Sequence, residues 1–411
     1  MPEHGKTVSP LMQKVFNRER FGKPQVLAGL LLLVFLAQCL WLVAHISPGA
    51  VSTEEFARVQ DGLAQWHSFR IAGIASFFRN RPDASLNLAY GPNHSPLWYL
   101  IEATPLALFR ADLTSALGIW LSRIPYIFIG TMLGASLWYV SRRLYGNNGG
   151  YIALSLYCFS PAVIRSTVLW FAPPNIAGAW GTFGAVFTAI AVSHTLYAPR
   201  EVILWNWRRI VLLGISLALA IGSRFSLAIV LPLLIVFMLY VAWERRAVAL
   251  AIFLASCAIA SFLLFLSYFL QWRTFFSSLL TANWFDLSGP ALVMNGAWLP
   301  VLRELAASGP VLLSLGPAAL IGYALWSRPR YFGNTAPLMV AVLFLVWRAG
   351  TPHDPNSVFG LIAVVFLFLF IAGVAADFLE TSFRELTASI IAGLLVANAL
   401  WNLMRIAAIH P

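Results

Sequence analysis

Long apolar segments constrain this chain more than any other feature of its sequence. A helix needs about 20 consecutive apolar residues to cross a bilayer. Runs of roughly that length lie near 25–46, 117–141, 149–170, 175–196, 210–243, 248–270, 310–326, 334–348, 357–376 and 384–404. The run 210–243 is too long for one span and has Arg224 in its middle, so we divide it in two. The sequence therefore predicts an all-α, polytopic membrane helix bundle with about 11 spans.

Composition and charge support a membrane protein and argue against a nucleic-acid partner. The 411 residues are 60% hydrophobic and 10% charged, whereas soluble domains average about 25% charged residues. The net charge of +11 comes from basic residues in short loops, which is the positive-inside pattern. It also suits attraction to the anionic headgroups of membrane lipids. No basic patch is interleaved with aromatic residues, so no nucleic acid is expected as a partner.

The basic residues also predict the orientation of the chain. Those of the tail 1–24 put the N-terminus in the cytoplasm, because cytoplasmic loops carry the excess of Lys and Arg. The segment 95–110 is short and contains Glu102 and two prolines, so we expect a surface helix there. The outer face then receives two long loops, 47–116 and 271–309. We expect a multi-pass protein of a bacterial inner membrane.

Glu54 and Glu55 form an acidic pair a few residues after the first span. Adjacent carboxylates near a bilayer surface repel each other, and one of such a pair can serve as a general base. The same residues also fit a helix start, with Ser52 as the cap and Glu55 three positions further on. The sequence leaves both interpretations open.

His94 precedes Ser95 and Pro96 near the end of the first outer loop. Proline is common in the first turn of a helix, so we expect His94 or Ser95 to cap a helix at this point. A histidine in this position can hold a phosphate or relay a proton. It can equally be a polar cap at the interface.

Three arginines, Arg123, Arg165 and Arg224, fall near the outer ends of the expected helices. Arginine is costly inside a membrane and is usually paired or functional there. Because guanidinium binds phosphate through two parallel hydrogen bonds, three arginines facing one leaflet suit a phosphate-bearing lipid. The alternative is that each side chain extends along the apolar surface to reach the headgroups.

His353 and Asp354 lie at the tip of an expected outer hairpin. Such a pair can bind a divalent cation or substrate hydroxyls, but the Asp-Pro-Asn sequence at 354–356 is also ordinary turn chemistry. The three cysteines are far apart in apolar segments, and no zinc-binding or nucleotide-binding motif occurs. Apart from that possible cation, we expect no metal and no cofactor.

Four segments together resemble the membrane-embedded GT-C glycosyltransferases, in the group of protein mannosyltransferases and aminoarabinose transferases. The acidic pair resembles that family's Asp-Glu motif, and 93–100 resembles its His-Pro-Pro-Leu-Tyr-Tyr helix. The segment 122–146 resembles its Arg-Leu-Pro span, and 222–225 resembles its Thr-Lys-Tyr turn. Order and spacing agree over 25–245, which we take as a GT-C-like module; 246–411 is a C-terminal transmembrane region.

The resemblance implies two surface helices in the first outer loop and transfer of a sugar from a polyprenyl-phosphate donor on the non-cytoplasmic face. It implies that Glu54 deprotonates the acceptor hydroxyl, with Glu55 beside it. It also implies that Arg123 and Arg224 hold the donor phosphate and that His94 lines the cavity.

Two other functions remain open at the level of sequence. The chain has Glu54 where the family usually has Asp, and Ser95 where it has Pro. A non-catalytic GT-C-like subunit, held by protein partners in a larger membrane complex, is therefore an alternative. A lipid or solute transporter is the third, but it needs a polar site near the bilayer midplane, and the polar residues gather instead at the outer ends.

Overall fold

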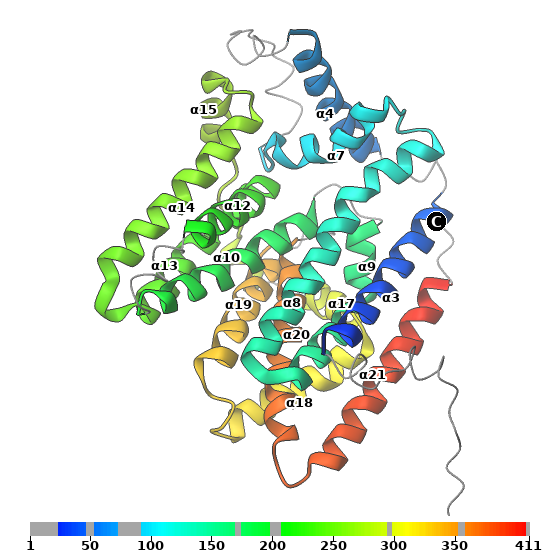
Figure 1. Ribbon diagram of the computed structural model, residues 1–411, viewed down its shortest axis with the longest axis vertical. Coiled ribbons are helices and arrows are strands. Elements are labelled where there is room, and N and C mark those ends of the chain that lie inside the picture. The colour runs from blue at the N-terminus through cyan, green and yellow to red at the C-terminus, as the bar shows by residue number, and fades with distance from the viewer. Residues whose placement is uncertain are drawn as a thin grey trace, which may run out of the picture.

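The computed structural model describes residues 24–46, 53–72, 92–168, 174–197, 207–293, 298–351 and 358–407. Within these ranges the regular elements are all helical, so the all-α class is confirmed (Figure 1). The longer helices are α3 (Pro24–His45), α4 (Thr53–Ala72), α7 (Pro96–Phe109), α8 (Ala116–Cys158), α9 (Pro161–Val168), α10 (Asn175–Thr195), α12 (Trp207–Ser223), α13 (Val230–Val241), α14 (Arg246–Ser267), α15 (Trp272–Thr281), α17 (Trp298–Ala307), α18 (Pro310–Leu325), α19 (Phe332–Ala349), α20 (Val358–Leu379) and α21 (Arg384–Ala407). Shorter elements are η2 (Phe225–Ile229), η3 (Trp243–Arg245) and α16 (Gly289–Val293).

Helix α8 is a hairpin of two antiparallel arms. A straight helix of its 43 residues would be roughly 65 Å long at 1.5 Å per residue, about twice the apolar thickness of a bilayer. The backbone turns at Gly146, where φ is 72° and ψ is −173°. The Tyr157 hydroxyl donates to the Gly130 carbonyl at 2.5 Å, and a Cβ on Gly134 would meet the Tyr157 ring. These contacts bring the second arm back beside the first.

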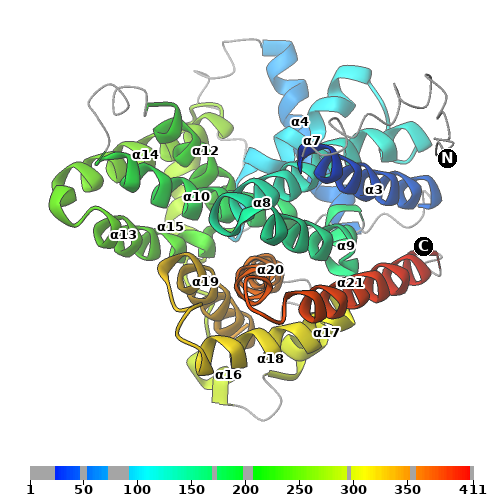
Figure 2. The same cartoon turned by 60° about the horizontal axis from the view of Figure 1, so that its bottom comes forward.

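Helix α20 forms the centre of the bundle (Figure 2). Its apolar residues are buried along most of their length, and α8, α10 and α19 pack around it. Phe366 of α20 lies 5.5 Å from the ring of Phe183 and stacks on Phe187 of the same helix α10 at 5.8 Å. A helix that is apolar on all sides is typical of a protein core or of a membrane span, and α20 lies in the core of this bundle.

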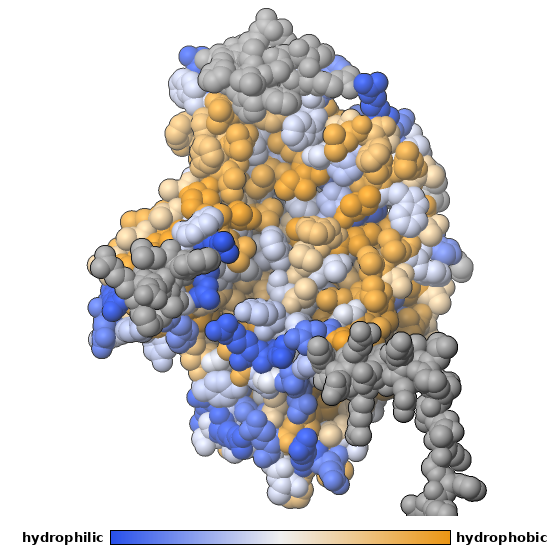
Figure 3. Space-filling model, in the orientation of Figure 1, coloured by the Kyte–Doolittle hydropathy of each residue, from blue (hydrophilic) through white to orange (hydrophobic). Residues whose placement is uncertain are grey.

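The outer surface of the bundle is apolar where a bilayer would surround it. Figure 3 shows hydrophobic residues across the middle of one face, with hydrophilic residues gathered below them. Large apolar side chains such as Leu33 of α3 and Leu254 of α14 are exposed, at 60% and 58%. Exposed apolar surface on this scale marks a membrane protein.

Seven described helices are long and apolar enough to cross a membrane. The pair α17 and α18, bent by 112°, raises the number to eight if it counts as one span. Hairpin α8 is counted as one span in these numbers, and the apolar helix Phe225–Val241 is shorter than a usual span. A multi-pass membrane protein is therefore shown, while the expected count of about 11 stays a prediction.

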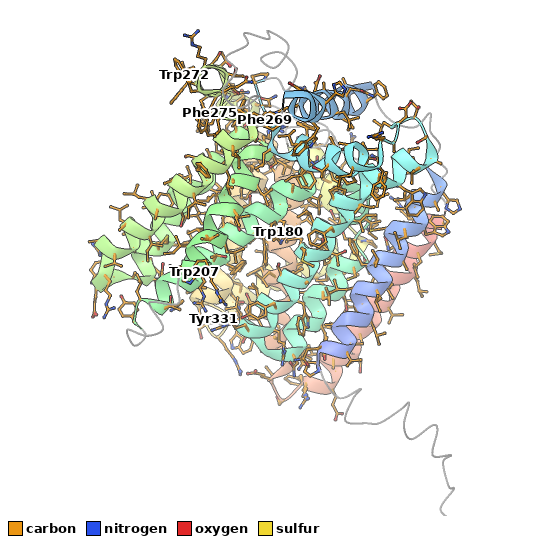
Figure 4. All side chains as sticks on the ribbon, turned by 45° about the horizontal axis from the view of Figure 1, so that its top comes forward. Trp180, Trp207, Phe269, Trp272, Phe275 and Tyr331 are labelled. Carbon is orange, nitrogen blue, oxygen red and sulfur yellow. The ribbon has the colours of Figure 1, made fainter. Side chains whose placement is uncertain are left out.

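Helices α4 and α7 lie together across one end of the bundle (Figure 1). Helix α7 is the element expected over 95–110, and Ser95 is its N-cap. The Trp66 indole of α4 donates to the Leu100 carbonyl of α7 at 2.9 Å. Figure 4 shows Phe269, Trp272 and Phe275 gathered at this same end, where aromatic residues suit a membrane interface.

Candidate functional site

Residues 93–95 bind to the break between α12 and η2. The Ser95 amide and hydroxyl both donate to the Gly222 carbonyl at 3.0 Å, and the Phe225 amide donates to the Asn93 carbonyl at 2.9 Å. The backbone of Arg224 is extended at this break, with φ −159° and ψ 122°. The helical hydrogen bonds of α12 therefore end at Arg224. The loop provides hydrogen-bond partners for backbone amides and carbonyls that have no partner within the helix at this break. Two motifs that are far apart in the sequence thus meet in one place.

His94 takes part in the same contact. Its Nδ1 donates to the Ser223 carbonyl, so this nitrogen carries a hydrogen, because a carbonyl only accepts. In the neutral ring Nε2 is then the basic nitrogen. The helix cap is Ser95, whose hydroxyl accepts from the Leu97 amide at 3.3 Å. His94 is thus a buried, oriented side chain, and the expected alternative of a His94 cap is wrong.

Arg224 forms a buried ion pair with Asp286. Its Nη2 lies 2.6 Å from Asp286 Oδ2, and each side chain is only 9% exposed. Asp286 also accepts from the Ser226 hydroxyl at 3.0 Å and from the Trp347 indole at 2.7 Å. The guanidinium lies 4.8 Å over the Phe359 ring. An acid from the second long loop therefore occupies the place where the sequence suggested a lipid phosphate.

A second ion pair connects the same loop to α19. Arg348, 2% exposed, donates from Nε to Glu304 Oε1 at 2.6 Å and from Nη1 to the Thr351 carbonyl at 2.9 Å. Trp347 and Arg348 are neighbours in the sequence, so the end of α19 contacts both Asp286 and Glu304. Sequence reasoning placed Asp286 on the outer face but found neither pairing, because the partners are 61 and 44 residues apart.

Arg123 is a buried residue near the start of α8. It is 2% exposed, and its Nη1 donates to the Ser122 hydroxyl at 3.0 Å. One turn away, the Tyr126 hydroxyl donates to Glu102 Oε2 at 2.8 Å. Glu102 of α7 is 1% exposed, so its side chain points into the bundle. Glu102 of α7 and Arg123 of α8 are therefore both buried groups, of opposite charge.

The remaining expected site residues are only partly described. Glu54 and Glu55 belong to the first turn of α4, but their side chains lie outside the described part of the structure. His353 and Asp354 also lie outside the described residues. Arg165 is on α9, which packs against α3 and α21, and among the described residues it forms no ion pair with Asp286. Among the described residues, no group of three His, Cys, Asp or Glu side chains could hold a metal ion.

Comparison with known proteins shows similarity in structure and not in sequence. No protein-family model and no curated protein sequence matches the chain. The fold is similar to that of the archaeal oligosaccharyltransferase AglB from Archaeoglobus fulgidus in complex with an inhibitory peptide and a dolichol-phosphate. The TM-score is 0.57 at 14% identity, over 92% of this chain and 55% of that one.

Two further structures of the same oligosaccharyltransferase agree. The apo form gives a TM-score of 0.54 at 15% identity, over 93% of this chain and 55% of that one. The form tethered to an acceptor peptide gives 0.51 at 15% identity, over 93% and 54%. The chain thus spans just over half the length of these structures. The expected likeness to GT-C membrane glycosyltransferases is confirmed at the level of the fold.

Proposed function

We propose that this protein is a membrane glycosyltransferase that moves a sugar from a polyprenyl-phosphate donor to an acceptor hydroxyl. The shared fold carries the proposal, because one structure of that fold holds a dolichol-phosphate, which is a polyprenyl lipid phosphate. Fold alone does not imply function. The cluster of His94, Arg224 and Asp286 at the end of the bundle that carries α4 and α7 adds the polar, buried groups that such chemistry needs.

The proposed reaction is a single displacement at the anomeric carbon. The Glu54 carboxylate takes the proton of the acceptor hydroxyl, whose oxygen then forms the new glycosidic bond. The bond between the sugar and the phosphate oxygen breaks, and polyprenyl phosphate leaves with the electron pair. Arg123 and Arg224 stabilise the charge on the leaving phosphate. For Arg224, a phosphate oxygen must share or replace the carboxylate of Asp286.

A non-catalytic subunit is the second candidate, and the Arg224–Asp286 pair favours it. The Arg224 guanidinium is already paired with a buried carboxylate, so it needs no negatively charged substrate to neutralise it. In that case the polar cluster serves to fix the second long loop against α12 and α19. Stable association with other membrane proteins would then be the function.

The test compares Glu54→Gln with Glu55→Gln in purified protein. Undecaprenyl-phosphate-linked mannose and aminoarabinose serve as donors, and release of undecaprenyl phosphate is followed by mass spectrometry. We expect Glu54→Gln to slow release by about 100-fold or more, as for loss of a general base. Glu55→Gln is the matched control, with a much smaller loss expected.

Two results would contradict the proposal. One is equal release by the wild type and Glu54→Gln. The other is a wild type that releases nothing and carries no polyprenyl phosphate. The second result, together with fixed-stoichiometry partners in a mild-detergent preparation, would support the non-catalytic subunit.

A further inference from the structure

Helices α3, α9 and α21 are joined by polar side chains on the side of the bundle away from α12 and α14 (Figure 1). Asn402 of α21 donates to the Gln38 side chain of α3 at 2.6 Å. Gln38 donates to the Cys158 carbonyl at 3.1 Å, and Asn398 donates to the Phe159 carbonyl at 3.0 Å. These carbonyls border the break before α9, where Pro161 has no N–H to donate. The three helices therefore meet at one level.

Two arginines follow this level at similar distances along the chain. Arg165 comes six residues after Phe159 on α9, and Arg405 comes seven residues after Asn398 on α21. Helix α9 packs against α21, and the positive charge of Arg405 is close enough to act on Arg165. Like charges so placed repel each other. The arrangement is unfavourable unless something negative lies between them.

The described part of the chain supplies no such anion. Arg165 is half-buried, and its Nε is enclosed without a hydrogen-bond acceptor. No carboxylate among the described residues forms an ion pair with Arg165 or Arg405. A buried donor without an acceptor costs about 1–3 kcal/mol, and an unpaired charge costs more. A ligand that offers oxygen acceptors and negative charge would remove both costs.

The surroundings of the pair suit the headgroup region of a membrane. The guanidinium of Arg405 lies 4.7 Å over the ring of the exposed Trp401. On α3, the rings of Trp41 and His45 are tilted against each other with centroids 4.2 Å apart, and the ends of α3 and α21 lie on the same side in Figures 1 and 4. Tryptophan and arginine are among the residues that anchor helices at the bilayer interface. The neighbouring Leu403 and Met404 are exposed apolar residues that acyl chains can cover.

We propose that Arg165 and Arg405 bind the phosphate of a lipid on the membrane-facing surface between α9 and α21. The phosphate accepts hydrogen bonds from both guanidinium groups, and the acyl or polyprenyl chain lies against α21. The site is separate from the cluster of His94 and Arg224 and does not depend on the proposed reaction. It places Arg165 in a lipid site apart from Arg123 and Arg224, with which the sequence groups it.

The experiment measures lipid retention by mass spectrometry of the intact protein. Wild type and Arg165→Gln/Arg405→Gln are titrated with phosphatidylglycerol, with undecaprenyl phosphate, and with phosphatidylcholine as the lipid without net charge. Arg273→Gln is the matched control, because Arg273 also lies over an exposed tryptophan, Trp272 at 5.2 Å. We expect the double variant to lose at least about tenfold in affinity for a lipid with a negative phosphate, which is roughly the effect of one charged hydrogen bond.

The arms of the experiment separate the two lipid sources. Loss of phosphatidylglycerol alone identifies a bilayer phospholipid, and loss of undecaprenyl phosphate alone identifies a polyprenyl lipid; either result supports the site. Unchanged retention of both lipids in the double variant, or an equal loss in Arg273→Gln, overturns the proposal. The single variant Arg405→Gln changes only an exposed residue, so it keeps the test valid if the double variant fails to fold.

Discussion

The ion pair between Arg224 and Asp286 makes a sharp energetic prediction. Both side chains are 9% exposed, so removing one partner leaves the other in a poorly hydrated place. Breaking a buried pair in this way costs about 3–5 kcal/mol. In Arg224→Gln, Asp286 keeps the Ser226 and Trp347 donors, so we expect the lower end of that range. In Asp286→Asn, Arg224 keeps the Phe359 ring, which compensates about 1–2 kcal/mol.

The double variant Arg224→Gln/Asp286→Asn should cost less than the sum of the two single changes. Neither neutral amide leaves an uncompensated charge, and the two amides can bond to each other. We expect a coupling energy of about 2–3 kcal/mol. The matched control is Arg328 with Glu380, whose side chains are 43% and 66% exposed. For an exposed pair the coupling should stay below about 1 kcal/mol.

Unfolding in mixed micelles of detergent and SDS, followed by tryptophan fluorescence, measures both cycles. The four proteins of each cycle are compared at one ionic strength, since salt screens the exposed pair more than the buried pair. A coupling energy for Arg224 and Asp286 no larger than that of the control pair would refute the reasoning. It would mean that water reaches the cluster despite its burial.

Three further predictions concern the rest of the molecule. Gly146→Ala should destabilise the folded protein by about 1–3 kcal/mol, because the backbone conformation at Gly146 is nearly restricted to glycine. Gly393→Ala, in an open helical position, should stabilise the folded protein by up to about 1 kcal/mol. SDS unfolding midpoints measure both changes. Asn402→Ala should cost about 1 kcal/mol through loss of the bond to Gln38, measured in the same assay, and an unchanged midpoint would contradict it. Burial raises the pKa of Asp61, so the folded state binds the proton of this carboxyl more tightly than the unfolded state does. Helix α4 should therefore become less stable as pH rises from about the ordinary pKa of 3.8 through the raised pKa. Hydrogen exchange of α4 measures this change, and Asp61→Asn should remove the pH dependence.

Local patterns in the sequence predicted several elements well. The helix expected over 95–110 is α7, Pro96–Phe109, because Ser95 and Pro96 are local signals of a helix start. The expected break at Arg224 is also present. Both features depend on residues a few positions apart, which a sequence displays directly.

Pairings between distant residues could not be found in the same way. Asp286 lies 62 residues after Arg224, and only the packing of the second long loop brings them together. The break at Phe159 is stabilised by Asn398, 239 residues away. The neighbouring sequence displays only a proline and gives no sign of this distant partner. The sequence groups Arg165 with Arg123 and Arg224 because it predicts all three at one leaflet. Height along the membrane does not determine which side of the bundle a residue occupies.

The Arg224–Asp286 pair also separates the two functional proposals by physical argument. Phosphate and carboxylate are both oxygen anions, so a donor phosphate can take over the guanidinium without leaving it unpaired. Asp286 then retains only the Ser226 and Trp347 donors, and this cost weakens donor binding. In an enzyme, Asp286→Asn should therefore tighten the binding of undecaprenyl phosphate. In a structural subunit the pair closes the site, and the same change would only destabilise the fold.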